Sequence, residues 1–151
     1  MMRKKAERME QTAVSGNLDN MAMKGLEEAE RGLTIEKNQW PADIDEAGNR
    51  YVEFVIGGAE KTLLVQQISF VLEGKICYRI AYARGKDFYP RTDMGERQQA
   101  TDSTDKVVLP VNETLNPGER LHIRLFPWST KADKDLYFKI KEGTFTGVEI
   151  E

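Results

Sequence analysis

Residues 115–128 read LNPGERLHIRLFPW, a turn followed by a run in which apolar and polar residues alternate. Asn-Pro-Gly is a turn sequence, because proline pre-sets one backbone angle and glycine accepts a left-handed conformation. Side chains of a strand point alternately to its two faces, so the branched aliphatic residues of this run share one face. Arg120, His122 and Arg124 share the other. The stretch predicts a half-buried β-strand that ends at an aromatic Phe-Pro-Trp stop.

The rest of the chain repeats this kind of pattern. Predicted strands, rich in β-branched and aromatic residues, cover residues 33–36, 51–56, 62–72, 76–82, 106–111, 120–126, 136–140 and 145–150. Residues 73–75 (EGK) predict a tight hairpin between two of these strands. Residues 21–30 predict a loop with a short helix, and residues 85–105 a long polar excursion. About eight or nine strands without long helices predict an all-β fold, an antiparallel β-sandwich or jelly roll.

The length of 151 residues suits one domain with a single core. We expect residues 1–12 to form a flexible N-terminal segment and residues 13–151 to form a single β-sandwich domain. Charged residues make up 31% of the chain and the formal net charge is -3, so no basic field is available to recruit nucleic acid.

No apolar run approaches the roughly 20 residues that a membrane-spanning helix needs. The basic start of the chain has no apolar run behind it, so a signal peptide is not visible. Three readings stay open: a cytoplasmic protein, a mature secreted protein, or a piece of a longer chain.

The single cysteine and the single histidine limit the chemistry available. Cys77 cannot form an intrachain disulfide, and we interpret it as a small buried hydrophobe rather than a reactive thiol. His122 is interpreted as a surface residue of its strand rather than one half of a catalytic dyad. Phosphate-binding glycine loops, nucleophile elbows and paired-histidine metal motifs are absent from the sequence.

Two readings apply to the acidic segment of residues 43–49 (DIDEAGN). Asp43, Asp45, Glu46 and Asn49 offer hard oxygen ligands, so the loop could hold a structural calcium ion. The terminal glutamate of the twelve-residue calcium loop is missing, because Phe54 stands there, and a solvated polar loop is the favoured interpretation. No other cofactor is expected.

Aromatic and cationic side chains are the remaining candidates for a ligand-binding site. A sugar presents apolar C–H faces and a ring of hydroxyl groups, so its site needs aromatic platforms beside hydrogen-bond donors. We expect Phe88 and Tyr89 to be exposed, whereas core packing is favoured for the two tryptophans, each of which adjoins a proline. The candidate ligand-binding residues are Trp40, Tyr82, Arg84, Tyr89, Arg124 and Trp128.

Several segments together resemble one family. They are residues 14–16 (VSG), 32–35 (GLTI), 38–41 (NQWP), 50–54 (RYVEF), 65–70 (VQQISF), 81–82 (AY), 115–128 and 148–150 (VEI). In this order they resemble the accessory β-sandwich domains of secreted bacterial pectate lyases and related polysaccharide-degrading enzymes. The resemblance covers about residues 13–151, and residues 118–128 are its sharpest part.

This resemblance implies a non-catalytic, carbohydrate-binding-like module that binds polysaccharide or positions a neighbouring catalytic domain on it. It also implies an extracellular or periplasmic location and no catalytic residues in this chain. A purely structural spacer is the alternative. A small hydrolase or lyase that uses Arg84, Lys86, Asp87 and Tyr89 of the long polar loop is a third reading.

Overall fold

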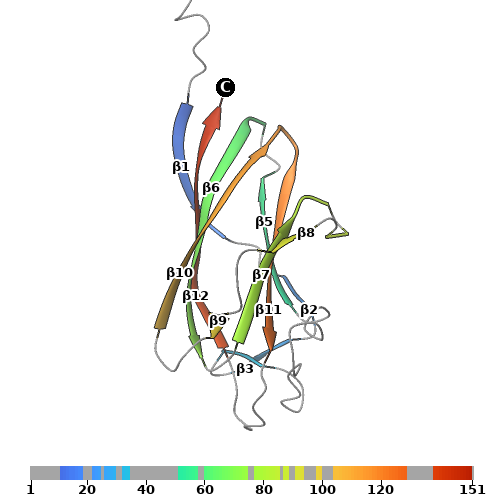
Figure 1. Ribbon diagram of the computed structural model, residues 1–151, viewed down its shortest axis with the longest axis vertical. Helices are drawn as coiled ribbons and strands as arrows, with labels where there is room; N and C mark the ends of the chain where they lie inside the picture. Colours follow the sequence, from blue (N-terminus) through green and yellow to red (C-terminus); the bar gives the residue numbers. More distant parts are fainter. Residues whose placement is uncertain are drawn as a thin grey trace, which may run out of the picture.

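The described strands of the computed structural model lie in two antiparallel sheets that face each other (Figure 1). The structure describes residues 11–18, 22–24, 26–29, 32–34, 51–57, 60–74, 77–85, 87–88, 91–93, 98–99, 104–128 and 138–150. Within these ranges every regular element is a strand, which confirms the predicted all-β antiparallel sandwich.

One layer, called the β6 sheet here, has the strand order β10-β6-β12-β4-β3, and β1 also pairs with β12. Its strands are β1 (Gln11–Asn17), β3 (Glu27–Ala29), β4 (Gly32–Thr34), β6 (Thr62–Gly74), β10 (Thr104–Leu115) and β12 (Phe138–Ile150). The start of β1 lies beside the end of β12, since Gln11 pairs with Ile150.

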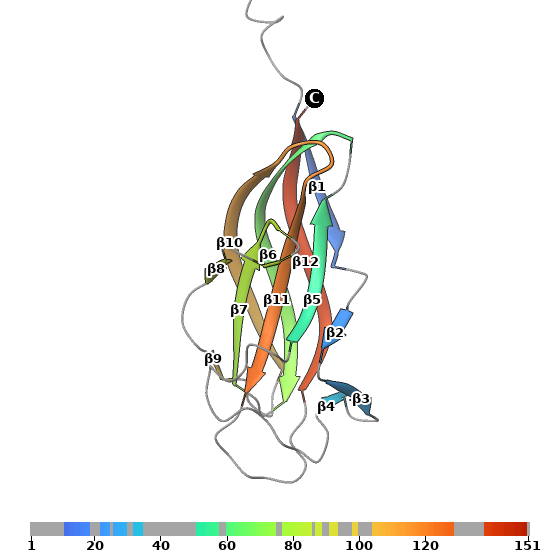
Figure 2. The same ribbon diagram turned by 90° about the vertical axis from the view of Figure 1, so that its right-hand side faces the viewer.

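The other layer, called the β11 sheet, has the order β2-β5-β11-β7-β8, and β9 also pairs with β7 (Figure 2). Its strands are β2 (Ala22–Lys24), β5 (Tyr51–Gly57), β7 (Cys77–Ala83), β8 (Arg91–Asp93), β9 (Gln98–Gln99) and β11 (Arg120–Trp128). Strand β11, which follows the Asn-Pro-Gly turn, therefore lies at the centre of its sheet.

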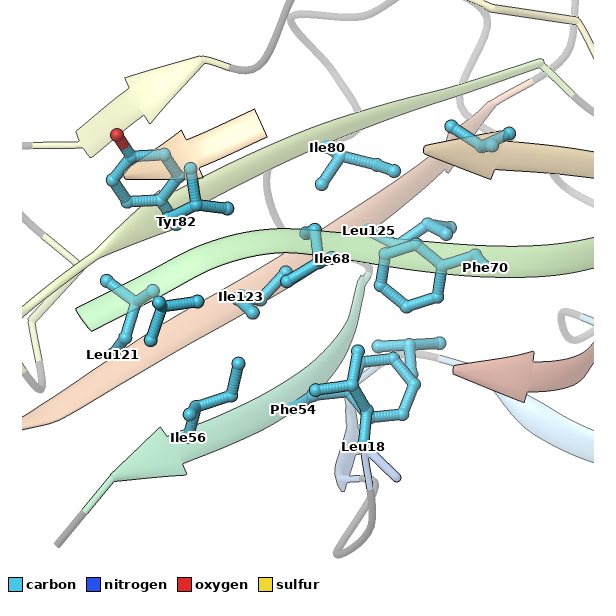
Figure 3. Close-up of a cluster of buried hydrophobic side chains, with 14 of the residues drawn as sticks. Leu18, Phe54, Ile56, Ile68, Phe70, Ile80, Tyr82, Leu121, Ile123 and Leu125 are labelled. Carbon is cyan, nitrogen blue, oxygen red and sulfur yellow. The ribbon is translucent and has the colours of Figure 1, made fainter. Parts of the chain in front are cut away.

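The main core fills the space between the two sheets. Side chains alternate along each strand, so every second residue of the long strands enters this space. Figure 3 shows side chains of both layers meeting there. Its buried residues are Leu18, Val52, Phe54, Ile56, Leu63, Val65, Ile68, Phe70, Leu72, Tyr78, Ile80, Tyr82, Val107, Val111, Leu115, Leu121, Ile123 and Leu125.

The predicted hairpin at residues 73–75 is wrong. Strand β6 pairs with β10 and β12, whereas β7 pairs with β11, β8 and β9, so the chain crosses from one sheet to the other at this point. The crossing places the apolar face of β6, which carries Phe70, opposite the apolar face of β7, which carries Ile80. A hairpin would have put both faces on the same side of one sheet, without this mutual burial.

The predicted break between strands 136–140 and 145–150 is also wrong, because β12 runs without interruption from Phe138 to Ile150. Gly143 serves packing there and not a turn. A Cβ atom at this position would come within 3.2 Å of Leu18 Cβ and 3.4 Å of Phe70 Cδ1. Leu18 is held at this point, since its amide donates a 2.7 Å hydrogen bond to the Gly143 carbonyl.

Two further segments differ from the prediction. Residues 21–30, expected as a loop with a short helix, contain the strands β2 and β3. The polar excursion of residues 85–105 contributes β8 and β9, which both pair with β7. Short polar strands carry little apolar periodicity, so their pairing with an existing strand gives no sequence signal.

Candidate functional site

The outer face of the β11 sheet carries a group of aromatic and charged side chains. Its centre is Arg124 of β11, which lies between two rings. The guanidinium carbon is 4.1 Å from the centroid of the Tyr51 ring and 4.2 Å from the centroid of the Phe88 ring. At these distances both rings attract the cation through their electron-rich faces. We call Tyr51, Arg124 and Phe88 the arginine stack.

A carboxylate fixes the arginine stack from the neighbouring strand. Glu53 of β5 lies directly opposite Arg124 in the register of the sheet. Arg124 Nε donates a 2.8 Å hydrogen bond to Glu53 Oε1, and the two side chains are only 16% and 17% exposed. A charge-assisted bond in so little water is stronger than a solvated surface pair.

His122 lies two residues before Arg124 on the same face. Its Nδ1 atom is 3.5 Å from Glu53 Oε1, and its side chain is 14% exposed. This nitrogen is buried and has no hydrogen-bond partner among the described residues. A buried polar atom without a partner is unfavourable, and the same burial keeps this nitrogen from contact with a ligand. The expected surface histidine is thus outward-facing but mostly covered.

Small side chains on β7 make room for the arginine stack. Ala81 and Ala83 stand opposite Arg124 and His122 in the register. Phe88 packs over them together with Phe126, and it is only 6% exposed. The prediction that Phe88 is exposed is therefore wrong, because the chain after β7 folds back over the alanines and buries the ring.

The backbone at Phe88 has an unusual conformation. Its φ of 56° is in the left-handed region, which a bulky side chain rarely adopts. Its amide donates a 3.0 Å hydrogen bond to the Gly85 carbonyl, which closes a turn. The Phe88 and Phe126 rings meet edge to face with centroids 6.1 Å apart, and this packing offsets the backbone strain.

A second cluster lies at the edge between the sheets and joins them. Glu113 of β10 accepts hydrogen bonds from Arg84 Nε at 3.2 Å and from Arg84 Nη2 at 3.0 Å. The Tyr82 hydroxyl, at the margin of the core in Figure 3, donates to the same carboxylate at 3.4 Å. Glu119 lies 3.7 Å from Arg84 on its other side. Burial, followed by the charge of Glu113, raises the pKa of Tyr82 above its ordinary value.

The structure divides the predicted ligand-binding residues. Tyr82 and Arg84 meet at Glu113, whereas Arg124 points to the opposite face of the β11 sheet. The residue before it in the chain, Ile123, pairs with Tyr82 and enters the core, so Arg124 faces outward. The other predicted positions lie outside the described residues: Trp40, Tyr89 and the side chain of Trp128.

The predicted calcium ligands also lie outside the described residues, namely Asp43, Asp45, Glu46 and Asn49. Among the residues that the structure describes, no cluster of three or more histidine, cysteine, aspartate or glutamate side chains could hold a metal ion. Calcium binding by residues 43–49 stays a prediction of the sequence. Within the same described ranges, no helix is long and apolar enough to span a membrane.

Sequence reasoning missed the partners of Arg124. Tyr51 and Glu53 belong to a predicted strand in which every second residue faces outward, and this alternation is the signal that marks them as surface positions. Their contact with Arg124 depends on the pairing of β5 with β11, which are separated by five intervening strands in the chain. No local pattern in the sequence encodes that pairing.

Comparisons with known proteins give fold likenesses at low identity. No protein-family model matches the chain, and no curated protein matches it. Among solved structures, it is similar to a family two carbohydrate esterase from Cellvibrio japonicus, with 9% identity and a TM-score of 0.48. That match covers 95% of this chain and 36% of the esterase chain, so this chain spans about a third of the esterase's length.

Carbohydrate-binding modules of family 29 are similar over nearly their whole length. A point mutant of one such module matches with 10% identity and a TM-score of 0.48, over 92% of each chain. A second module of this family, from Piromyces equi, matches with 8% identity and a TM-score of 0.45, over 92% of this chain and 91% of that chain. With TM-scores below 0.5, these likenesses carry no argument about function.

Proposed function

We propose that this chain is a non-catalytic module that binds a polysaccharide on the outer face of the β11 sheet. The observation that carries the proposal is the arginine stack, in which Arg124 lies between two rings while Glu53 accepts its hydrogen bond. A surface arginine normally samples many rotamers in water, whereas this one is held on three sides.

A preformed polar group of this kind suits a sugar. Each sugar hydroxyl both donates and accepts a hydrogen bond, and Arg124 and Glu53 supply donors and acceptors side by side. Because both side chains are already ordered, a ligand would pay little further conformational entropy to engage them.

The resemblance of the sequence to accessory domains of polysaccharide-degrading enzymes supports this proposal. We extend the proposal accordingly to a neighbouring catalytic domain as partner and to an extracellular or periplasmic location. Only the arginine stack indicates where on this chain a polysaccharide would bind.

The experiment is affinity electrophoresis of the purified chain in gels that contain soluble polysaccharides, with dissociation constants from calorimetry. The test variant is Arg124→Lys, which keeps the charge but loses the planar group that stacks between two rings. We expect it to weaken binding by about tenfold or more, which corresponds to about 1.4 kcal/mol.

The matched control is Arg120→Lys, the same substitution on the same strand at an exposed position. We expect its affinity to stay within about twofold of the parent, since an exposed arginine outside the stack is easily replaced. Thermal melts of both variants show whether they remain folded. Because Arg120 lies on the same face as Arg124 but outside the stack, equal weakening by the two substitutions would show that the arginine stack has no special role in binding. A parent chain that no polysaccharide retards would refute glycan binding.

A structural spacer is the second candidate, and one observation favours it. Phe88 and Phe126 are only 6% and 4% exposed, so neither ring offers an open platform on which a sugar could stack. In this reading the arginine stack is a lid over a small apolar cluster and stabilises the sheet without a ligand. The electrophoresis experiment distinguishes the two functions.

A further inference from the structure

Four charged side chains near the centre of the outer face of the β11 sheet form two opposite pairs, and Arg120 is exposed on the same face at the start of β11. Arg124 is bonded to Glu53 at the centre of the face. Arg79 of β7 forms an ion pair with Asp93 of β8, which lies on the same face because Asp93 stands opposite the outward-facing Ala81. Two cations and two anions therefore cancel at the centre of the face, and Arg120 adds an exposed cation at one end of it.

The arginines of both pairs are mostly covered. The Arg79 and Arg124 side chains are each 16% exposed, and Glu53 is 17% exposed. A charge so far removed from water is stabilised chiefly by its partner, and separation of such a pair leaves a poorly solvated ion behind. These pairs are expected to persist when a ligand arrives.

An anionic sugar fits this face poorly. Its carboxylate or sulfate would have to share Arg124 with Glu53, and like charges at such short range repel each other. His122 is no substitute partner, since its Nδ1 atom already lies 3.5 Å from the same Glu53 oxygen. Lys24 lies at the margin of the face, with its Nζ atom 6.0 Å from the centroid of the Tyr51 ring, and Arg120 lies at the start of β11. Both side chains are exposed, so salt screens their charges.

A neutral sugar fits better. A guanidinium has five N–H donors and a carboxylate has about four acceptor sites, so one hydrogen bond between them uses only part of that capacity. A hydroxyl group can donate to the carboxylate and accept from the guanidinium without separating them. We propose that this face selects uncharged polysaccharides over uronate-containing or sulfated ones, an inference that rests on the proposed glycan-binding function.

The test uses polysaccharide pairs that share a backbone and differ in charge. They are methyl-esterified and de-esterified galacturonan, hydroxyethylcellulose and carboxymethylcellulose, and dextran and dextran sulfate. The full chain is run in affinity gels at about 0.15 M salt, where exposed charges are screened beyond about 8 Å. We expect at least one neutral polymer to retard the chain more than its charged counterpart does.

The outcomes separate this inference from the proposed function. Equal or stronger retardation by the charged member in every pair that retards the chain would overturn the neutral preference and leave glycan binding intact. Absence of retardation by all the polymers would overturn both.

A charge variant provides a second measurement that does not depend on loss of folding. Glu53→Gln removes the anion beside Arg124 but keeps an amide oxygen that can accept its hydrogen bond. We expect this variant to gain about threefold or more in affinity for the charged polymers, because the guanidinium is no longer neutralised. Glu60→Gln, an identical change at an exposed turn position, is the control for overall net charge. Equal affinities of the two variants for charged polymers would contradict the inference.

Discussion

Arg124 shows how one side chain can be held by several weak contacts. Its guanidinium has a ring on each side and a carboxylate at its edge, and each contact belongs to a different segment of the chain. The sequence pattern correctly places Arg124 on the outer face of its strand. The pattern does not show that the side chain is mostly covered. Alternation along a strand predicts the face to which a side chain points, but not its exposed fraction.

The contribution of the Arg124 and Glu53 pair can be measured with a double-mutant cycle. We expect Arg124→Met to lower the free energy of unfolding by about 1–3 kcal/mol, because Glu53 is left poorly solvated without its donor. The double variant with Glu53→Gln is expected to recover part of this loss, since no unpaired charge remains. Urea unfolding of the four proteins gives the coupling energy. A double variant less stable than Arg124→Met would show that the pair does not act as described.

Two glycines at strand ends and turns have a positive φ, but they differ in the space around them. Gly57, at the end of β5, has a φ of 111°, and Gly118, in the turn before β11, has a φ of 84°. Both backbones are in a region that L-residues avoid. They differ in space, because a Cβ atom at Gly57 would lie 2.4 Å from the Glu119 carbonyl oxygen, whereas nothing lies within 4 Å of one at Gly118.

Alanine substitutions separate the two effects. In Gly118→Ala the new methyl group has open space, so the only cost is the positive φ, which alanine disfavours. We expect this substitution to lower the unfolding free energy by about 1–2 kcal/mol. In Gly57→Ala alanine again has an unfavourable positive φ, and its methyl group also clashes with the backbone of Glu119. We therefore expect Gly57→Ala to lower the unfolding free energy more than Gly118→Ala does. Chemical denaturation of both variants checks this order. Equal losses would mean that the β5 end relaxes freely around the added methyl group.

The predicted strands were largely correct as segments and wrong in two of their connections. The apolar alternation of β5, β7 and β11 is visible locally and places their core residues correctly. The short glycine-containing segment at residues 73–75 looks like a hairpin turn, yet it connects opposite sheets. Gly143 looks like a break, yet it leaves room for Leu18 and Phe70. Both errors arise because a glycine in sequence does not distinguish a turn from a close approach.

The two sheets are joined at one edge through Glu113, where β10 departs from regular pairing. The register of β10 and β6 shifts between Pro110 and Glu113, and Asn112 has a φ of 53°. Such a bulge re-aims a side chain, and here Glu113 accepts hydrogen bonds from Tyr82 and Arg84 of the other layer. The contact therefore links the layers directly.

This contact predicts a dependence of stability on alkaline pH. The pKa of Tyr82 is raised above 10.0, first by burial and then by Glu113. The folded protein therefore holds the phenol proton more tightly than the unfolded chain does. The corresponding stability is fully present below about pH 10, the ordinary tyrosine pKa, and is lost as the pH rises through the folded value.

Tyr82→Phe isolates this contribution, since it removes the titrating hydroxyl and keeps the ring in the core. We expect the unfolding free energy of the parent to decrease more steeply than that of the variant above about pH 10. Urea unfolding between about pH 8 and pH 11.5 provides the comparison. Parallel curves would show that Tyr82 titrates alike in the folded and unfolded chains.

The amino-acid sequence by itself determined the all-β class and the residues of each long strand that face the core. These properties depend on a period of two along the chain, which is local. The tertiary structure alone decided which strands are neighbours, and with them the site. Arg124 and Glu53 are 71 positions apart, and Tyr82 and Glu113 are 31 apart. Such contacts depend on how all the strands together bury their apolar faces, so no single stretch of sequence contains them.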